Sequence, residues 1–226
     1  MIRTHNLRKI YRMGNVEVKA LDGVGIDIGK GEFVGIMGPS GSGKSTLLHM
    51  LGLLDFPTEG EIEIDGIDLG TLNDYQQTMF RLYRLGYVFQ DYALVPELTV
   101  MENVCLPAML REDRTYEQNR EATIDILKRI GLYDRRDHLQ GELSGGQQQR
   151  VAIARAIVNK PDILFADEPC ANLDTENSRM VLDLFHEINE EMQQTIVMVS
   201  HEDWHKEYFH RVIRLKDGVV VEDTTT

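Results

Sequence analysis

The residues best suited to chemistry lie at positions 38–46, which read Gly-Pro-Ser-Gly-Ser-Gly-Lys-Ser-Thr. Glycines let a backbone curl so that successive N–H groups point at a phosphate, and a helix that follows adds its positive N-terminal end. Lys44 can reach the β- and γ-phosphates of a nucleotide, and the Ser45 hydroxyl can bind Mg²⁺. A chance match to this pattern is expected in only about 1% of chains of this length. The expected nucleotide contacts are Gly38, Ser40, Gly41, Ser42, Gly43, Lys44, Ser45 and Thr46.

Two carboxylates end a second apolar segment, in which residues 163–166 are followed by Asp167 and Glu168. An acid at the carboxyl end of a parallel strand can hold Mg²⁺ directly or through water, and we expect this of Asp167. Glu168 lies one residue further on, where it could orient or deprotonate an attacking water. An ordinary polar strand end is the alternative interpretation, and the phosphate loop upstream favours the catalytic one.

A second helix start capable of binding an anion lies at residues 144–147, which read Ser-Gly-Gly-Gln and precede a helix body at residues 151–154. Backbone N–H groups and the Ser144 hydroxyl would supply the donors. One nucleotide needs only one phosphate loop, so a second anion site in the same chain requires an explanation.

Residues 143–147, Leu-Ser-Gly-Gly-Gln, resemble the LSGGQ signature of ABC ATPases. The resemblance implies an ATP-hydrolysing homodimer in which the signature of one subunit closes over the γ-phosphate held by the other. The implied signature contacts with ATP are Ser144, Gly145, Gly146 and Gln147.

Further positions match the same family in order along the chain. Gln90 resembles the Q-loop residue that contacts Mg²⁺ and senses the permease, and residues 171–174 resemble the D-loop at the dimer interface. His201 resembles the switch histidine that hydrogen-bonds the γ-phosphate, and Tyr11 resembles the aromatic that stacks on adenine. Taken alone, Gln90 and His201 would be surface polar residues, and Tyr11 a core or strand aromatic.

Within the family, segments 51–60, 86–90, 94–100 and 102–104 are most similar to the MacB/LolD group. That similarity implies a separate integral membrane permease as partner, work in export, lipoprotein release or envelope mechanotransmission, and a cytoplasmic location on the inner face of the membrane. Two departures are Cys170-Ala171, where the group more often has Thr-Gly, and Ser200, where Thr is usual.

The elements that must position these residues indicate an α/β fold. We expect a P-loop NTPase (RecA-like) core with an N-terminal antiparallel β subdomain, formed by residues 1–90 and 160–226, and an inserted helical subdomain at 91–159. Expected strands cover residues 24–28, 32–37, 162–166, 195–199 and 211–215, and Asp-Gly pairs at 22–23, 65–66 and 217–218 are typical of hairpin turns. Two amphipathic helices are expected, with apolar faces at Thr123, Ile126, Leu127 and Ile130 and at Val181, Leu184, Phe185 and Ile188. Gly131 would end the first of these helices, and Asp174 would cap the second.

The amino-acid composition limits the kinds of partner that the chain can bind. The 226 residues include 24 Lys and Arg against 37 Asp and Glu, a net charge of −13, which argues against a nucleic-acid partner. No apolar run approaches the ~20 residues of a membrane-spanning helix, so a role at a membrane would require docking on another chain. The two isolated cysteines are typical of a reducing compartment.

Three other functions are alternatives, and the sequence argues against the first of them. A DNA-repair or translation ABC ATPase would carry a long coiled coil or a second cassette, and neither is present. A permease-regulating subunit of the FtsE type would share these motifs, as would the ATPase of an amino-acid importer.

Overall fold

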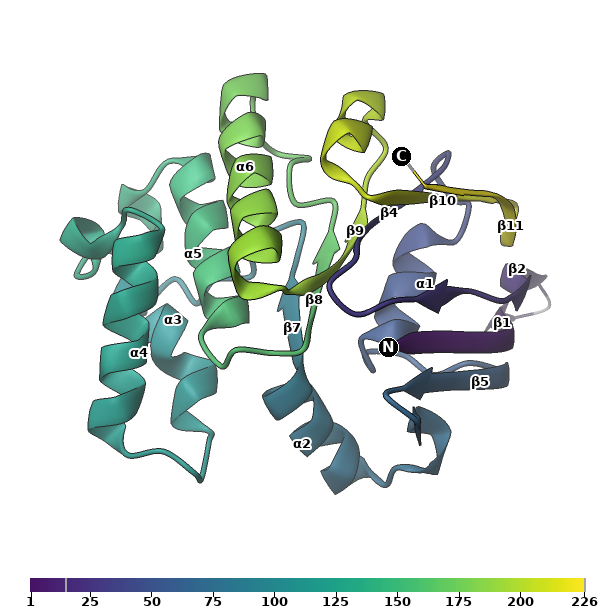
Figure 1. Cartoon of the computed structure of the whole chain (residues 1–226), viewed down its shortest axis with the longest axis horizontal. Coiled ribbons are helices and arrows are strands. Elements are labelled where there is room, and N and C mark those ends of the chain that lie inside the picture. Colours follow the sequence, from purple (N-terminus) through teal and green to yellow (C-terminus); the bar gives the residue numbers. More distant parts are fainter. Residues whose placement is uncertain (15, 226) are drawn as a thin grey trace.

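Two β-sheets form the framework of the chain in the computed structural model, which describes residues 1–14 and 16–225 (Figure 1). The antiparallel sheet has the order β2-β1-β5-β6, with β3 paired to β1. The other sheet has the order β11-β10-β4-β9-β8-β7, and all its pairs are parallel except β10 with the edge strand β11. The strands are β1 (Ile2–Met13), β2 (Val16–Val24), β3 (Asp27–Ile28), β4 (Phe33–Met37), β5 (Glu59–Ile64), β6 (Ile67–Asp68), β7 (Leu85–Val88), β8 (Ile163–Asp167), β9 (Thr195–Val199), β10 (Arg211–Lys216) and β11 (Val219–Thr225).

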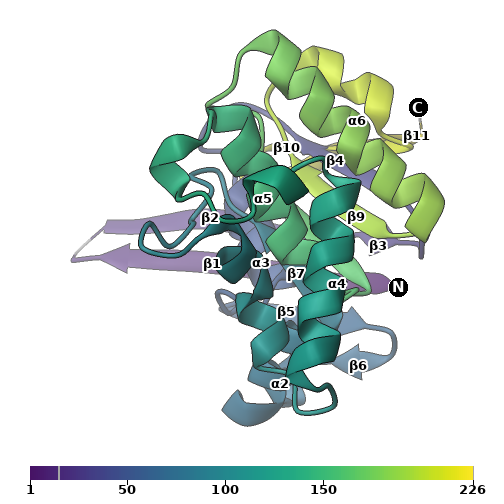
Figure 2. The same ribbon diagram turned by 90° about the vertical axis from the view of Figure 1, so that its left-hand side faces the viewer.

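Helices cover the parallel sheet, and one of them separates it from the antiparallel sheet. The helices are α1 (Lys44–Leu51), α2 (Asp74–Arg84), α3 (Val100–Met109), α4 (Tyr116–Arg129), α5 (Gly145–Ile157) and α6 (Thr175–Met192). Figures 1 and 2 show α3, α4 and α5 grouped on the side of the parallel strands away from β1, β2 and β5. Within the described residues, none of the helices combines the length and apolar character that crossing a bilayer needs.

The parallel strands divide the interior into two apolar cores. Successive side chains of a strand point to opposite faces, and β8 is buried on both. Leu164 and Ala166 pack with the helical side, whereas Ile163 and Phe165 pack with α1 and the antiparallel sheet. Strands β4 and β9 alternate in the same way. This arrangement explains why these strands have near-continuous apolar sequences, and it holds their carboxyl ends at one edge, where the phosphate loop and Asp167 lie.

The predicted α/β class, with one antiparallel and one parallel sheet, is confirmed. The turns at Asp65-Gly66 and Asp217-Gly218 are hairpins as expected, with φ of 49° and 78° in both pairs. The turn expected at residues 22–23 is wrong. Both residues lie inside β2 opposite an irregularity at Leu7/Arg8, where Gly23, at φ 83°, accommodates the bulge.

Helix predictions agree in place and burial. On α4, Thr123, Leu127 and the C-cap Ile130 are buried, Ile126 is half-buried, and Gly131 follows at φ 68°. On α6, Val181, Leu184, Phe185 and Ile188 are buried, and the Asp174 carboxylate accepts a hydrogen bond from the Asn177 N–H at 2.8 Å. The strand expected at 24–28 is shorter than predicted: β2 ends at Val24, and only Asp27 and Ile28 form β3.

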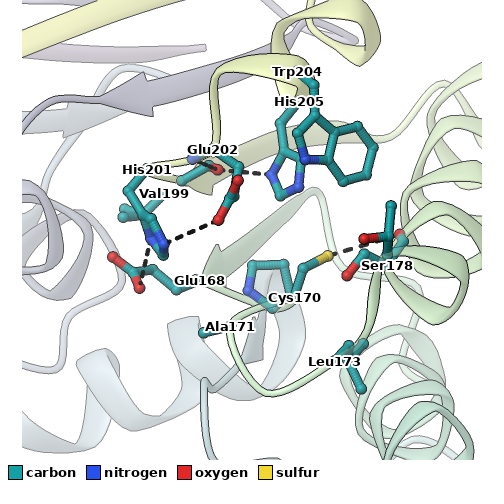
Figure 3. A pocket seen from close by; sticks show the side chains of 13 residues that line it. Glu168, Cys170, Ala171, Leu173, Ser178, Val199, His201, Glu202, Trp204 and His205 are labelled. Atoms are coloured by element: carbon teal, nitrogen blue, oxygen red, sulfur yellow. Dashed lines mark hydrogen bonds and ion pairs between the residues drawn. The ribbon is translucent and has the colours of Figure 1, made fainter.

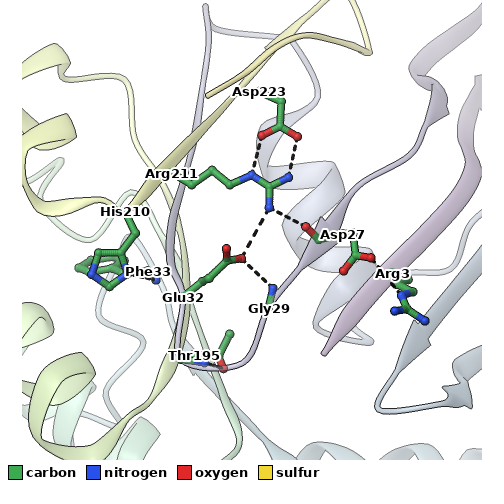
Figure 4. Close-up of polar contacts among 10 residues, drawn as sticks. Arg3, Asp27, Gly29, Glu32, Phe33, Thr195, His210, Arg211 and Asp223 are labelled. Carbon is green, nitrogen blue, oxygen red and sulfur yellow. Dashed lines mark hydrogen bonds and ion pairs between the residues drawn. The ribbon is translucent and has the colours of Figure 1, made fainter. Parts of the chain in front are cut away.

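A charged cluster joins the two sheets at the start of β10 (Figure 4). Arg211 donates to both carboxylate oxygens of Asp223 at 2.6 and 2.7 Å, and to the backbone oxygen of Asp27 on β3 at 2.7 Å. Glu32, 3.6 Å from the same guanidinium, accepts from the Gly29 N–H. The bidentate contact holds β11 on β10, and the bond to Asp27 holds β3 against the start of β10, whose Arg214 reaches the cavity of the phosphate loop.

Candidate nucleotide site

The phosphate loop joins β4 to α1 and is shaped by glycines at two close approaches. A Cβ on Gly38 would lie 2.1 Å from the Leu215 oxygen, and a Cβ on Gly43 would lie 2.3 Å from the Ala20 oxygen. Gly43 also caps α1 at φ 99°, a conformation that disfavours residues with a side chain. The loop therefore packs against strands on either side in a way that only glycine permits.

Lys44 is buried at the first position of α1, and its ammonium donates to the Pro39 oxygen at 3.0 Å. It lines an open cavity of about 500 Å³ together with Gly38, Ser40, Glu168 and His201. The structure thus brings the predicted phosphate lysine together with Glu168 and His201, which follow β8 and β9, in one cavity; Gln90, also predicted to be catalytic, does not line it.

Two of the three predicted metal ligands, Ser45 and Asp167, are in contact. The Ser45 hydroxyl donates to Asp167 Oδ1 at 2.9 Å, and Asp167 Oδ2 lies 3.3 Å from His49 Nε2. Mg²⁺ prefers one or two protein oxygens with the remainder from phosphates and water, and this pair of oxygen donors fits that preference. In the described part of the chain, no group of three or more His, Cys, Asp and Glu side chains could hold a metal ion.

Glu168 leaves the end of β8 in a left-handed conformation, φ 43°, which is uncommon for a residue with a side chain. Its N–H is held by the Val199 oxygen at 3.1 Å. Its carboxylate lies 3.2 Å from His201 Nδ1, while His201 Nε2 lies 3.4 Å from Glu202 (Figure 3). Strained backbone of this kind clusters at functional sites, and here it aims a carboxylate at the predicted switch histidine.

Gln90 follows β7 and is exposed. Its backbone oxygen accepts from the Asn172 amide at 3.2 Å, which ties the predicted Q-loop to the predicted D-loop. Contact between the Gln90 side chain and Mg²⁺ stays a prediction.

Tyr11 lies beside the phosphate loop, near the Thr46 hydroxyl. Its hydroxyl donates to Asp55 at 2.7 Å, and Lys9 both pairs with Asp55 at 2.6 Å and lies 4.9 Å from the Tyr11 ring centroid. Burial, then Asp55, raises the pKa of the Tyr11 hydroxyl, so it stays protonated and donating. Stacking on adenine remains a prediction for this ring.

The second helix start differs in detail from the prediction. Gly145 and Gly146 form the first turn of α5 rather than preceding it, because Ser144 is the N-cap. Ser144 Oγ accepts from the Gln147 N–H, and the Gln147 side chain accepts from the Ser144 N–H at 2.9 Å. A Cβ on Gly146 would lie 2.3 Å from Asn177 Oδ1, so this glycine allows α5 and α6 to pack closely. Residues 144–147 do not line the cavity of the phosphate loop.

Sequence reasoning missed several residues around the site. Asp55 and Lys9 hold Tyr11, and His49 holds Asp167. Tyr87 is half-buried with a buried hydroxyl, and burial, helped by the Asp167 carboxylate, raises the pKa of that hydroxyl. Asp55 and Tyr87 fall in segments that resemble the MacB/LolD group, but nothing in the sequence indicated these contacts, most of which join residues far apart in the chain.

This arrangement of loop, acidic strand end and helix signature agrees with the family comparison. The chain belongs to the ABC transporter family, whose model matches residues 21–171. Among its relatives is the lipoprotein-releasing system ATP-binding protein LolD of Aquifex aeolicus, 45% identical over 225 residues that cover 100% of this chain and 98% of that protein. The macrolide export ATP-binding/permease protein MacB of Rhodopirellula baltica is 43% identical over 99% of this chain, which spans only 33% of that relative.

Solved structures give the same assignment. The ATP-binding cassette MJ0796, from Methanocaldococcus jannaschii, solved as a dimer in a post-hydrolysis state bound to ADP and Pi, has a TM-score of 0.91 and 43% identity. The match covers 100% of this chain and 98% of that one. The resemblance to ABC ATPases and to the MacB/LolD group is confirmed.

Proposed function

We propose that this chain is the ATP-hydrolysing subunit of a transporter, works as a dimer, and powers a separate membrane permease of MacB/LolD type. The observation that carries the proposal is one cavity that gathers Lys44, Glu168 and His201 beside the hydrogen-bonded pair of Ser45 and Asp167. These are the charged and polar groups that phosphoryl transfer to water requires.

Each residue has a distinct role in the conversion of ATP and water to ADP and phosphate. Lys44 and the loop N–H groups hold the β- and γ-phosphates, and Tyr11 stacks on the adenine. Glu168 accepts a proton from the attacking water, and His201, 3.2 Å away, hydrogen-bonds the γ-phosphate. Ser45, Asp167 and Gln90 would hold Mg²⁺, which supplies positive charge against the phosphate oxygens.

The signature completes the site of a second copy. Ser144, Gly145, Gly146 and Gln147 form a helix start whose serine is exposed, outside the cavity of their own phosphate loop. A relative at 43% identity forms a dimer with ADP and Pi bound. A γ-phosphate gripped by both chains favours the closed dimer, and ADP, which lacks that group, releases it.

A groove of about 350 Å³ beside Gln90 is the proposed contact with the permease. Tyr87 and Phe89 line it from β7 and the segment after it, and Leu106 and Leu110 line it from α3 and its C-cap. Both leucines are exposed, at 39% and 64%. Apolar surface of this kind at the junction of the proposed core (1–90 and 160–226) and helical subdomain (91–159) suits a partner that must sense their relative motion. The chain would then lie on the cytoplasmic face of the membrane.

Phosphate release from ATP tests the proposal. We expect the purified chain, alone or reconstituted with its permease, to release phosphate only when Mg²⁺ is present, and the permease to change that rate. No Mg²⁺-dependent release in either form would refute the ATPase assignment. Phosphate release that does not respond to a co-purified membrane protein would refute the assignment of a permease partner and leave the ATPase assignment intact.

A further inference from the structure

A closed ring of hydrogen bonds links Ser200, Glu202 and His205, which lie on either side of His201 in the sequence. Ser200 Oγ accepts from the Glu202 N–H at 3.1 Å, and the Glu202 oxygen accepts from the His205 N–H at 3.1 Å. The ring closes where His205 Nδ1 lies 2.7 Å from Ser200 Oγ (Figure 3). A turn held by a serine hydroxyl alone is weak, so a second partner that fixes the hydroxyl also fixes the turn.

His205 is unusually placed for a histidine that belongs to no motif. It is 2% exposed, packs edge-on against Trp204 with ring centroids 4.3 Å apart, and lines a cavity of about 130 Å³ shared with Glu168, Cys170 and His201. Its Nε2 is buried and has no hydrogen-bond partner among the described residues. The ring therefore makes its one side-chain hydrogen bond through Nδ1.

Ser200 is held on the parallel sheet by its backbone. The Ser200 N–H donates to the Ile36 oxygen of β4, which extends the pairing of the parallel sheet by one residue beyond β9. Ser200 is held on the sheet and its hydroxyl contacts His205, so the turn between them is held at both ends, and in it His201 Nδ1 lies 3.2 Å from Glu168.

From this geometry we propose that His205 is a positioning residue for ATP hydrolysis, acting through Ser200 to hold the turn that aims His201 at the γ-phosphate and Glu168. The inference rests on the proposed ATPase function. His205 touches no reacting atom, so it should affect turnover while leaving nucleotide affinity intact. A small displacement of a catalytic group can reduce a rate by as much as about 100-fold.

Amide side chains separate this role from simple core packing. Asparagine places its amide where Nδ1 lies, and can donate to or accept from Ser200 whichever tautomer the native ring has. Glutamine places its amide where Nε2 lies. We expect His205→Asn to keep kcat within about twofold of the native chain, and His205→Gln and His205→Leu to lower it about tenfold or more. The KM for ATP and the affinity for a fluorescent ATP analogue should change by less than about twofold in all three.

Ser200→Ala supplies the matched control, because it removes the other half of the contact. It should lower kcat as His205→Leu does, and the double variant should be no worse than either single one. Thermal unfolding of each variant identifies any that fail to fold. If His205→Leu fails to fold, the comparison of the Asn and Gln variants, which are equal in polarity, still tests the proposal.

Equal kcat for the Asn and Gln variants, at any level, would overturn the positioning role, as would a loss confined to KM. A native chain that hydrolyses ATP while all His205 variants match it would overturn this inference and leave the proposed function intact. A native chain without hydrolysis would overturn both.

Discussion

At the scale of single residues, the site depends on a carboxylate held in an uncommon conformation. Glu168 is fixed by its N–H on β9 and faces His201 at 3.2 Å, so its orientation is set before nucleotide arrives. Pre-organised groups of this kind lower a barrier without reorganising during the reaction.

Replacement of Glu168 by Gln keeps the shape but removes the base. We expect kcat for ATP to fall by about 100-fold or more, with ATP affinity within about twofold, because the phosphates are held elsewhere. Steady-state phosphate release and equilibrium binding measure the two quantities. Glu61→Gln, an exposed change on β5, is the control and should leave both unchanged. A Glu168→Gln variant with near-native turnover would show that another group accepts the proton.

Burial of His205 should also make the stability of the folded chain depend on pH. Burial, with a smaller contribution from His201 and opposed by Glu202, lowers its pKa to about 4, below the value of about 6.5 expected when unfolded. The unfolded chain therefore binds a proton first, and stability is complete above about pH 6.5 and is lost as pH falls towards 4.

Relative to His205→Asn, which cannot titrate, the native chain should lose up to about 3 kcal/mol of unfolding free energy between pH 7 and pH 4. Urea unfolding at several pH values measures this difference. A difference that stays constant with pH would mean that the ring titrates normally in the folded chain.

At the scale of elements, α5 combines a structural start with a proposed binding surface. Ser144 forms a capping box with Gln147, and Thr115 forms the same box with Gln118 at the start of α4. The two helix starts are chemically alike, so a cap substitution should cost each helix a similar amount, about 1 kcal/mol.

Ser144→Arg should therefore match Thr115→Arg in stability but not in function. We expect only Ser144→Arg to abolish hydrolysis, since a long cation at the proposed dimer interface blocks closure, while ATP binding to the monomer persists. Chemical unfolding and phosphate release give the two readouts. Equal activity of the two variants would remove the signature from the active site.

How far the elements could be predicted depended on how local their signals are. Apolar runs within their own residues predict strands β4, β8 and β9, and helical spacing with an N-cap predicts helix α6. Helix α2 was not predicted, although Tyr75, Met79 and Leu82 recur at helical spacing and an Asn73–Gln76 capping box marks its start. Asp22-Gly23 misled because a bulge and a hairpin turn need the same positive φ.

The site was predictable to the extent that it lies in continuous motifs. Lys44, Ser45, Asp167 and Glu168 were identified from their neighbours in the sequence, whereas His201 was identified only through the family resemblance. The structure brings these residues together. Asp55 and His49 were not, because each acts on a residue far away: Tyr11 is 44 positions from Asp55. A single sequence carries no sign of such a pair.

At the scale of the whole molecule, the central claim is that the active site is shared by two chains. Residues 144–147 lie outside the cavity that holds Lys44 and Glu168, and a relative with 43% identity is dimeric with ADP and Pi. A chain with a net charge of −13 needs a strong attraction to self-associate, and a triphosphate bound from both sides can provide it.

The most direct test is the structure of the Glu168→Gln variant with ATP and Mg²⁺. We expect a dimer in which the Ser144 hydroxyl and the Gly146 N–H of one chain lie within hydrogen-bond distance of the γ-phosphate bound at Lys44 of the other. A nucleotide-loaded structure in which residues 144–147 of both chains lie away from every γ-phosphate would contradict it.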